Sequence, residues 1–173
     1  MDASPQRVKA VEQQTSEQRL TLRKAEKLRH RSLVEGLFRQ GKNIYEFPLR
    51  AIWRFIDQKE LADNFRDHIP ERIDPLQMMI TVPKKKRKKA VDRVLIRRRV
   101  REAYRLNRRG LKKKMEEHPN RGTLSVAFIY ISDTNLPYAT IEKKMKIILD
   151  RLAKKMICKD QLSEEGNDGE RDH

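Results

Sequence analysis

The residues with the most evident chemistry are the lysines and arginines of residues 84–109. Fourteen of these 26 residues are Lys or Arg, and only Asp92 and Glu102 are acidic, so the segment carries a local charge of +12. Its first six residues contain no apolar side chain and are predicted to form a flexible basic loop. A guanidinium group suits phosphate because its planar fork donates two parallel hydrogen bonds. The segment therefore indicates a surface that binds a run of phosphates.

The second part of this segment has the periodicity of a helix with two distinct faces. Apolar or small side chains share one face at 100° per residue: Ile96, Val100, Ala103, Tyr104, Asn107 and Leu111. Arginines share the other face: Arg97, Arg98, Arg101, Arg105, Arg108 and Arg109. A solvated helix face or a localisation signal is the alternative interpretation. Few Glu residues stand four positions from these arginines, which favours nucleic-acid binding, although charge alone does not separate DNA from RNA.

The composition of the whole chain limits the classes of protein to consider. The 173 residues have a formal net charge of +16 and are 37% hydrophobic, which allows one modest core. No apolar run approaches the ~20 residues of a membrane span, and the N-terminus does not have the pattern of a secretory signal, so we expect a cytoplasmic protein. The single cysteine, Cys158, and four scattered histidines argue against an internal disulfide and against a zinc site.

Three segments are expected along the chain. Residues 1–20 are polar and are predicted to be a disordered arm, and residues 158–173 are predicted to be a disordered acidic tail. Residues 21–157 are predicted to form a single RNA-binding α/β domain.

Within this domain the local patterns predict alternating helices and strands. A first helix contains Leu33 and Leu37, with Ser32 as its cap and Gly41 past its end. Period-2 alternation predicts a strand over residues 47–56, and residues 57–75 are expected to be a loop with one turn of helix. Further strands are expected at 77–82 and 123–132. An apolar stripe then predicts a closing helix: Ile141, Met145, Ile148, Leu149 and Leu152.

The sequence resembles the protein subunit of bacterial ribonuclease P. Leu28 and the run over residues 33–41, with Phe38 three residues before Gly41, match the spacing of the family's first helix. The segment Thr81-Val82-Pro83-Lys84-Lys85 matches the end of a family strand. The basic helix retains four basic positions of the family signature and the Glu after them: Arg93, Arg97, Arg98, Arg101 and Glu102. The resemblance covers about residues 20 to 156.

Three departures from the family pattern stand out. Val94 and Leu95 replace the signature Asn and second Arg, and Val34 replaces the first aromatic residue of the first helix. The strand position that often holds Tyr falls on Ile52. The connection over residues 57–75 is also longer than the family usually needs.

The resemblance implies both a fold and a function. The fold is an α/β (α+β) two-layer sandwich with a small mixed sheet, an N-terminal helix, a basic helix in a left-handed βαβ crossover, and a C-terminal helix. The function is that of the protein subunit of ribonuclease P, which binds the catalytic RNA subunit and the 5′ leader of precursor tRNA and assists endonucleolytic removal of the leader. Catalysis is then carried by the RNA subunit, which holds most of the Mg²⁺, and no obligate protein partner is inferred.

The resemblance also implies roles for individual residues of this chain. Phe38 becomes a stacking platform for a leader base in a cleft between the first helix and the sheet, and Arg50 and Arg54 are groove candidates. A core position is the alternative for Phe38. The remaining expected RNA contacts are Lys84, Lys85, Arg93, Arg97, Arg98, Arg101 and Arg105. No catalytic or metal-ligating side chain is expected.

Three other functions fit the sequence less well. A structural RNA-binding protein of the ribosome is the main alternative, and it predicts co-sedimentation with ribosomes and no preference for a leader. A self-contained enzyme is disfavoured because the sequence shows no nucleophile–base pair, Gly-rich phosphate loop or cluster of metal ligands. Sequence-specific DNA binding is disfavoured because no reader motif is visible.

Overall fold

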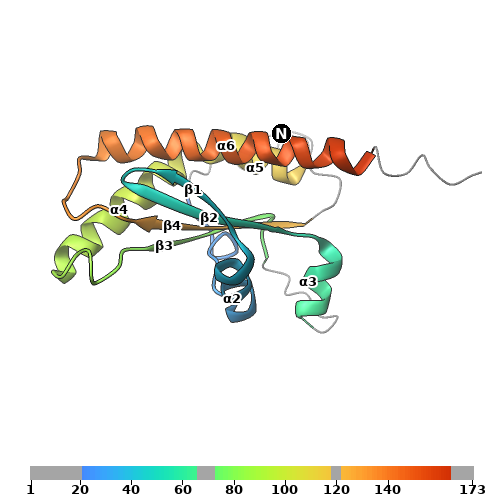
Figure 1. Ribbon diagram of the computed structural model, residues 1–173, viewed down its shortest axis with the longest axis horizontal. Helices are drawn as coiled ribbons and strands as arrows, with labels where there is room; N and C mark the ends of the chain where they lie inside the picture. Colours follow the sequence, from blue (N-terminus) through green and yellow to red (C-terminus); the bar gives the residue numbers. More distant parts are fainter. Residues whose placement is uncertain (1–20, 66–72, 118–121, 165–173) are drawn as a thin grey trace, which may run out of the picture.

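The computed structural model describes residues 21–65, 73–117 and 122–164 of this chain. Within these ranges the chain folds into five helices and four strands arranged around one sheet (Figure 1). In chain order the elements are α2 (Arg31–Gln40), β1 (Lys42–Glu46), β2 (Leu49–Ile56), α3 (Gln58–Asn64), β3 (Leu76–Thr81), α4 (Ala90–Asn107), α5 (Arg109–Glu116), β4 (Thr123–Tyr130) and α6 (Tyr138–Glu164).

The sheet is mixed, with strand order β1-β2-β4-β3. β2 is antiparallel to both of its neighbours, whereas β3 and β4 are parallel, with Met78 opposite Val126. Parallel neighbours require a crossover connection, and here the chain between them forms α4 and α5. The outer edge of β3 is covered by residues 25–28, because Met78 N–H donates to Glu26 O (2.8 Å) and Leu28 N–H donates to Met78 O (2.9 Å).

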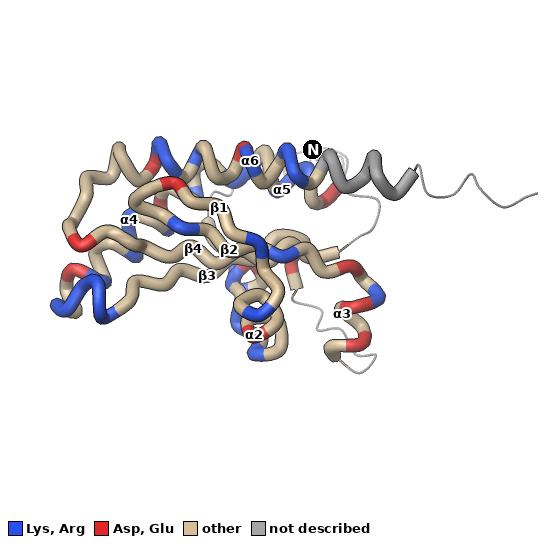
Figure 2. The backbone as a smooth tube through the Cα atoms, in the orientation of Figure 1, with Lys and Arg blue, Asp and Glu red and all other residues tan. Residues whose placement is uncertain are grey.

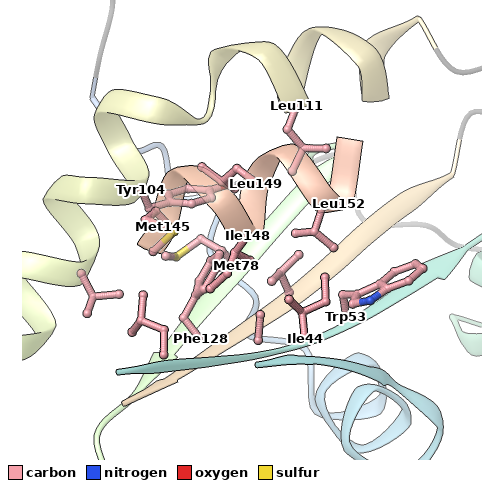
Figure 3. Packing of buried hydrophobic residues seen from close by; sticks show 14 of the residues in the cluster. Ile44, Trp53, Met78, Tyr104, Leu111, Phe128, Met145, Ile148, Leu149 and Leu152 are labelled. Atoms are coloured by element: carbon pink, nitrogen blue, oxygen red, sulfur yellow. The ribbon is translucent and has the colours of Figure 1, made fainter. Parts of the chain in front are cut away.

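The two faces of the sheet are covered differently. α4, α5 and α6 pack on one face, where Tyr104, Phe128 and Ile148 are fully buried (Figure 3). This helix layer and the sheet form the sandwich that the resemblance implies. On the other face, which we call the α2 face, Leu33 and Leu37 of α2 cover part of the sheet. β4 is buried on both sides, which explains its almost continuous apolar sequence.

The structure corrects the expected start of the chain's first helix and strand. α2 begins at Arg31 and its N-cap is His30, so Ser32 lies inside the helix rather than capping it. The strand expected at residues 47–56 begins at Leu49, because Phe47 and Pro48 form the turn that joins it to β1. β1 itself was not predicted. Only Ile44 is buried in this edge strand, so its sequence shows no period-2 apolar pattern.

The long connection after β2 contains a capped helix. Asp57 caps α3, since its Oδ1 accepts a hydrogen bond from Glu60 N–H (2.7 Å). Leu61 is buried in the cluster under α2, and Phe65 meets His30 edge to face with ring centroids 5.0 Å apart. The connection thereby extends the cover of the α2 face.

The last helix is longer than expected. α6 continues to Glu164, beyond the boundary expected at residue 157, because no Gly or Pro interrupts the chain before Gly166. The expected arm at 1–20 and the end of the expected tail, 165–173, lie outside the described residues. In the part of the chain that the structure describes, no helix combines the length and apolar character needed to cross a membrane.

Candidate nucleic-acid interface

Three arginines on the solvent face of α4 are the clearest candidates for phosphate contacts. Ile96, Val100 and Tyr104 are fully buried, so α4 is fixed against the core with Arg97, Arg98 and Arg101 turned away from it. Within residues 21–65, 73–117 and 122–164, these three guanidinium groups have no hydrogen bond or ion pair. Like charges on adjacent turns repel one another, and a row of phosphates would relieve that repulsion.

Two other arginines expected on this face, Arg105 and Arg108, are bound to neighbouring protein groups. Arg105 forms an ion pair with Glu102 (Nη2–Oε1, 2.5 Å). Arg108 is only 5% exposed, in contrast to the prediction that it joins the solvent face. The reason is that α4 ends at Asn107, and Arg108 then pairs with Glu26 (Nη2–Oε2, 3.3 Å) and donates to Thr21 O (3.0 Å).

The basic loop before α4 is anchored rather than flexible. Arg93 Nη1 donates to the carbonyl oxygens of Arg87 (2.8 Å) and Lys88 (2.5 Å), which fixes the loop against the start of the helix. Arg87 also pairs with Asp92 (2.7 Å). Lys84 and Lys85 remain exposed, and in the described ranges neither has a charged or hydrogen-bonded partner. Figure 2 shows this loop as a continuous basic stretch at one end of the molecule.

Phe38 lies on the exposed side of α2. Its side chain is 47% exposed, whereas Leu37, the preceding residue, is fully buried. The alternative of a core position for Phe38 is therefore excluded. An exposed aromatic ring beside the α2 face leaves one side available for stacking.

The two arginines of β2 share the α2 face but differ in their surroundings. Arg54 is partly buried beneath α2, where its Nη2 pairs with Glu60 of α3. A Cβ on Gly36 would lie 2.8 Å from Arg54 Nη1, so glycine at that position allows α2 to pass over the guanidinium. Arg50 lies near the start of β2, where its Nε donates to Asn43 Oδ1 (2.9 Å).

The sequence patterns did not predict the exposed apolar side chains that lie near these arginines. Tyr45 in β1 and Phe47 in the following turn are 60% and 59% exposed. The signal for them was the pair of aromatic residues that flank Glu46. On α4, Val94 and Leu95 are also exposed, at the two positions where the family signature has Asn and Arg. The helix therefore presents an apolar strip beside its arginines.

The carboxylates of the described residues do not form a metal site. No group of three or more His, Cys, Asp or Glu side chains is placed to hold a metal ion within the described residues. The carboxylates of α4 and its loop are instead paired with arginines. Because the hydrogen bond from Arg105 outweighs the effect of burial, the pKa of Glu102 is lowered and the carboxylate stays charged.

Comparisons with known proteins give one consistent family. A family model described as Ribonuclease P matches residues 22–153. Ribonuclease P protein components from two strains of Porphyromonas gingivalis are 32% identical over 139 residues, which is 80% of this chain and 91% of each relative.

Solved structures agree on the fold. The ribonuclease P protein from Thermotoga maritima has a TM-score of 0.51 at 21% identity, covering 73% of this chain and 96% of that one. A mutant ribonuclease P protein from Staphylococcus aureus has a TM-score of 0.51 at 15% identity, covering 74% and 88%. The likeness to both structures is one of fold.

Proposed function

The chain belongs to the family of ribonuclease P protein components, and from this premise we propose that it binds a catalytic RNA subunit and the 5′ leader of precursor tRNA. Membership places it in tRNA processing, as part of an endoribonuclease holoenzyme. The holoenzyme would remove the leader by endonucleolytic cleavage and give the mature 5′ end. The location proposed for it is the cytoplasm, where its RNA partners would be made.

The observation that carries this proposal is the arginine row of α4, in which Arg98 and Arg101 are exposed and Arg97 is partly exposed. Arg97, Arg98 and Arg101 are held by a helix whose opposite face is buried, so the backbone is already in place and only the arginine side chains have to be ordered on binding. We assign this row to the backbone of the RNA subunit. Lys84 and Lys85 of the anchored loop are proposed to extend the contact. Arg93 and Arg105 would contribute less, because some of the donors of each guanidinium are already engaged.

The leader is proposed to lie along the α2 face. Phe38 would stack on a leader base, and Arg50 would contact the backbone next to it. Arg54 would mainly stabilise the packing of α2 and α3 and would contact RNA little, because Glu60 neutralises its charge beneath α2.

We propose that the RNA subunit carries the catalysis and holds most of the Mg²⁺. Phosphodiester hydrolysis by metal ions needs clustered ligands, and the described side chains do not fit such a site. The contribution of this chain would be positive charge and positioning. Its cations would lower the salt and Mg²⁺ needed to hold two RNAs together.

The role of Phe38 can be tested by substitution. Phe38→Leu should weaken binding of precursor tRNA to the holoenzyme about 5- to 150-fold, since a base stack contributes ~1–3 kcal/mol. Binding of mature tRNA should be unaffected, because it has no leader. The midpoint of thermal unfolding should change little, since the ring is half exposed. Equal weakening for precursor and mature tRNA would exclude a leader contact.

The proposed function as a whole is tested by reconstitution. A cognate ribonuclease P RNA should cleave a leader-bearing precursor tRNA at low Mg²⁺ only when this protein is added. If salt-sensitive RNA binding is seen but cleavage is not restored, the structural ribosomal alternative takes precedence. Co-sedimentation with ribosomes would then be the measurement to make.

A further inference from the structure

The sheet edge beyond α2 carries aromatic surface that the proposed function does not use. Tyr45 in β1 is 60% exposed, and Phe47 in the adjoining turn is 59% exposed. Tyr45 is paired directly with Arg50 in the β1–β2 register, so both side chains lie on the α2 face. This surface is therefore on the same side of the sheet as Phe38 and α2.

Tyr45 is held in a defined arrangement with its neighbours. The Arg50 guanidinium carbon lies 5.2 Å from the centroid of the Tyr45 ring, within the range of a cation–π contact. Arg50 Nε also donates to Asn43 Oδ1 (2.9 Å), on the same strand and the same face as Tyr45. The aromatic ring and the cation thus form a preorganised pair that still faces solvent.

The charge around this pair favours a polyanion. Glu46 is the one carboxylate in β1 and β2, and it lies on the opposite face, where Lys144 (3.1 Å) and Arg151 (2.7 Å) bind it. The strand register places the β1–β2 turn at the same end of the sheet as the basic loop after β3, because Leu49 pairs with Tyr130 and Thr81 pairs with Ile129. Figure 2 shows the basic loop before α4 at that end of the molecule.

We propose that Tyr45, together with Arg50, is a second stacking platform for single-stranded RNA. It would continue the path of the leader from Phe38 across the α2 face to the β1–β2 turn, and in this form it rests on the proposed function. An unpaired base can stack on Tyr45 while Arg50 neutralises the adjoining phosphate, an arrangement typical of single-strand binding surfaces. A duplex has its base faces covered and could not use the ring.

Leader length gives the sharpest test of this platform. The holoenzyme is titrated with precursor tRNAs whose leaders are shortened one nucleotide at a time, using wild-type protein, Tyr45→Leu and Tyr45→Phe. Tyr45→Leu should weaken binding of long leaders about 5- to 20-fold and leave the shortest leaders unchanged. Tyr45→Phe is the matched control, because it keeps the ring and should bind like the wild type. Thermal unfolding of all three proteins checks that the fold is intact.

Two outcomes of this titration would overturn the platform. One is an equal loss at every leader length, and the other is no loss at any length. If Tyr45→Leu instead abolishes self-association in sedimentation experiments, the surface is a contact between copies of the chain, and the proposal also fails.

A second measurement separates this inference from the proposed function. The protein alone is titrated with a single-stranded RNA oligonucleotide, comparing the wild type with Tyr45→Leu. If cleavage is not stimulated but oligonucleotide binding still depends on Tyr45, the stacking platform stands and the holoenzyme role fails. If oligonucleotide binding does not depend on Tyr45, the platform is overturned whatever the cleavage assay shows.

Discussion

Replacing Arg97, Arg98 and Arg101 together by Ala is expected to lower affinity for the ribonuclease P RNA about 100- to 1,000-fold at ~0.1 M salt. Each lost phosphate contact removes roughly 0.7–0.9 from the slope of log affinity against log salt, so three contacts should flatten it by about two to three. The fold should be unaffected, because these side chains make no contact that the described core needs. Filter binding or fluorescence titration over a range of salt concentrations measures both quantities.

Arg99 is the matched control for this experiment. It lies on the same helix, but its Nη1 donates to Leu136 O (2.6 Å) in the connection between β4 and α6. Arg99→Ala therefore removes an equal charge per residue from a different face, and the salt slope should hardly change. If Arg99→Ala flattens the slope as much as each of the three other substitutions, the effect is one of net charge. An unchanged slope in the triple variant would make the arginine row an ordinary solvated face.

The two faces of α4 were predictable in part because helical periodicity is a local property. Ile96, Val100 and Tyr104 recur at helical spacing, and all three are buried as predicted. Arg108 breaks the pattern, since its burial depends on Glu26, which is 82 residues away in the chain. An ion pair between such distant positions leaves no local signal in either segment.

The arginines of β2 show that local periodicity predicts which face a side chain lies on, but not what surrounds it. Alternation places Arg50 and Arg54 on one side of the strand, and the structure agrees. Their surroundings differ because α2 crosses the sheet over Arg54, and Glu60 reaches it from α3. The position of Tyr45 was also beyond local reasoning, because β1 is recognised as a strand only from its pairing with β2.

The charge cluster around Glu26 carries the second large expected effect. Glu26 is 1% exposed and lies between Lys112 Nζ (2.7 Å) and Arg108 Nη2 (3.3 Å). Lys112 also meets Asp74 (3.3 Å), just before β3. The cluster therefore joins residues 25–28, which cover the edge of β3, to the junction between α4 and α5.

Glu26→Ala should reduce the free energy of unfolding by about 3–5 kcal/mol, because the buried Arg108 loses the carboxylate that it pairs with, while the partly buried Lys112 keeps Asp74. Urea unfolding at neutral pH measures the change. Glu35→Ala is the matched control: Glu35 pairs with Arg31 at 2.6 Å, but both side chains are exposed, so stability should stay essentially unchanged. Similar losses for the two variants would show that the buried cluster contributes no more than a surface pair.

The pH dependence of the stability difference between the wild type and Glu26→Ala shows whether Glu26 acts through its charge or through its packing. Burial opposes ionisation of Glu26, but hydrogen bonds from Lys112 and from Arg23 N–H, with the charge of Arg108, outweigh it and lower the pKa of the carboxyl below 4.5. A group whose pKa is lower in the folded state stabilises the fold fully above its unfolded pKa, and this contribution is lost as the pH falls through the folded pKa. The stability gap between wild type and Glu26→Ala should therefore be widest above about pH 4.5 and narrow below it. A gap that stays constant on acidification would mean that Glu26 acts through its volume, because packing does not titrate.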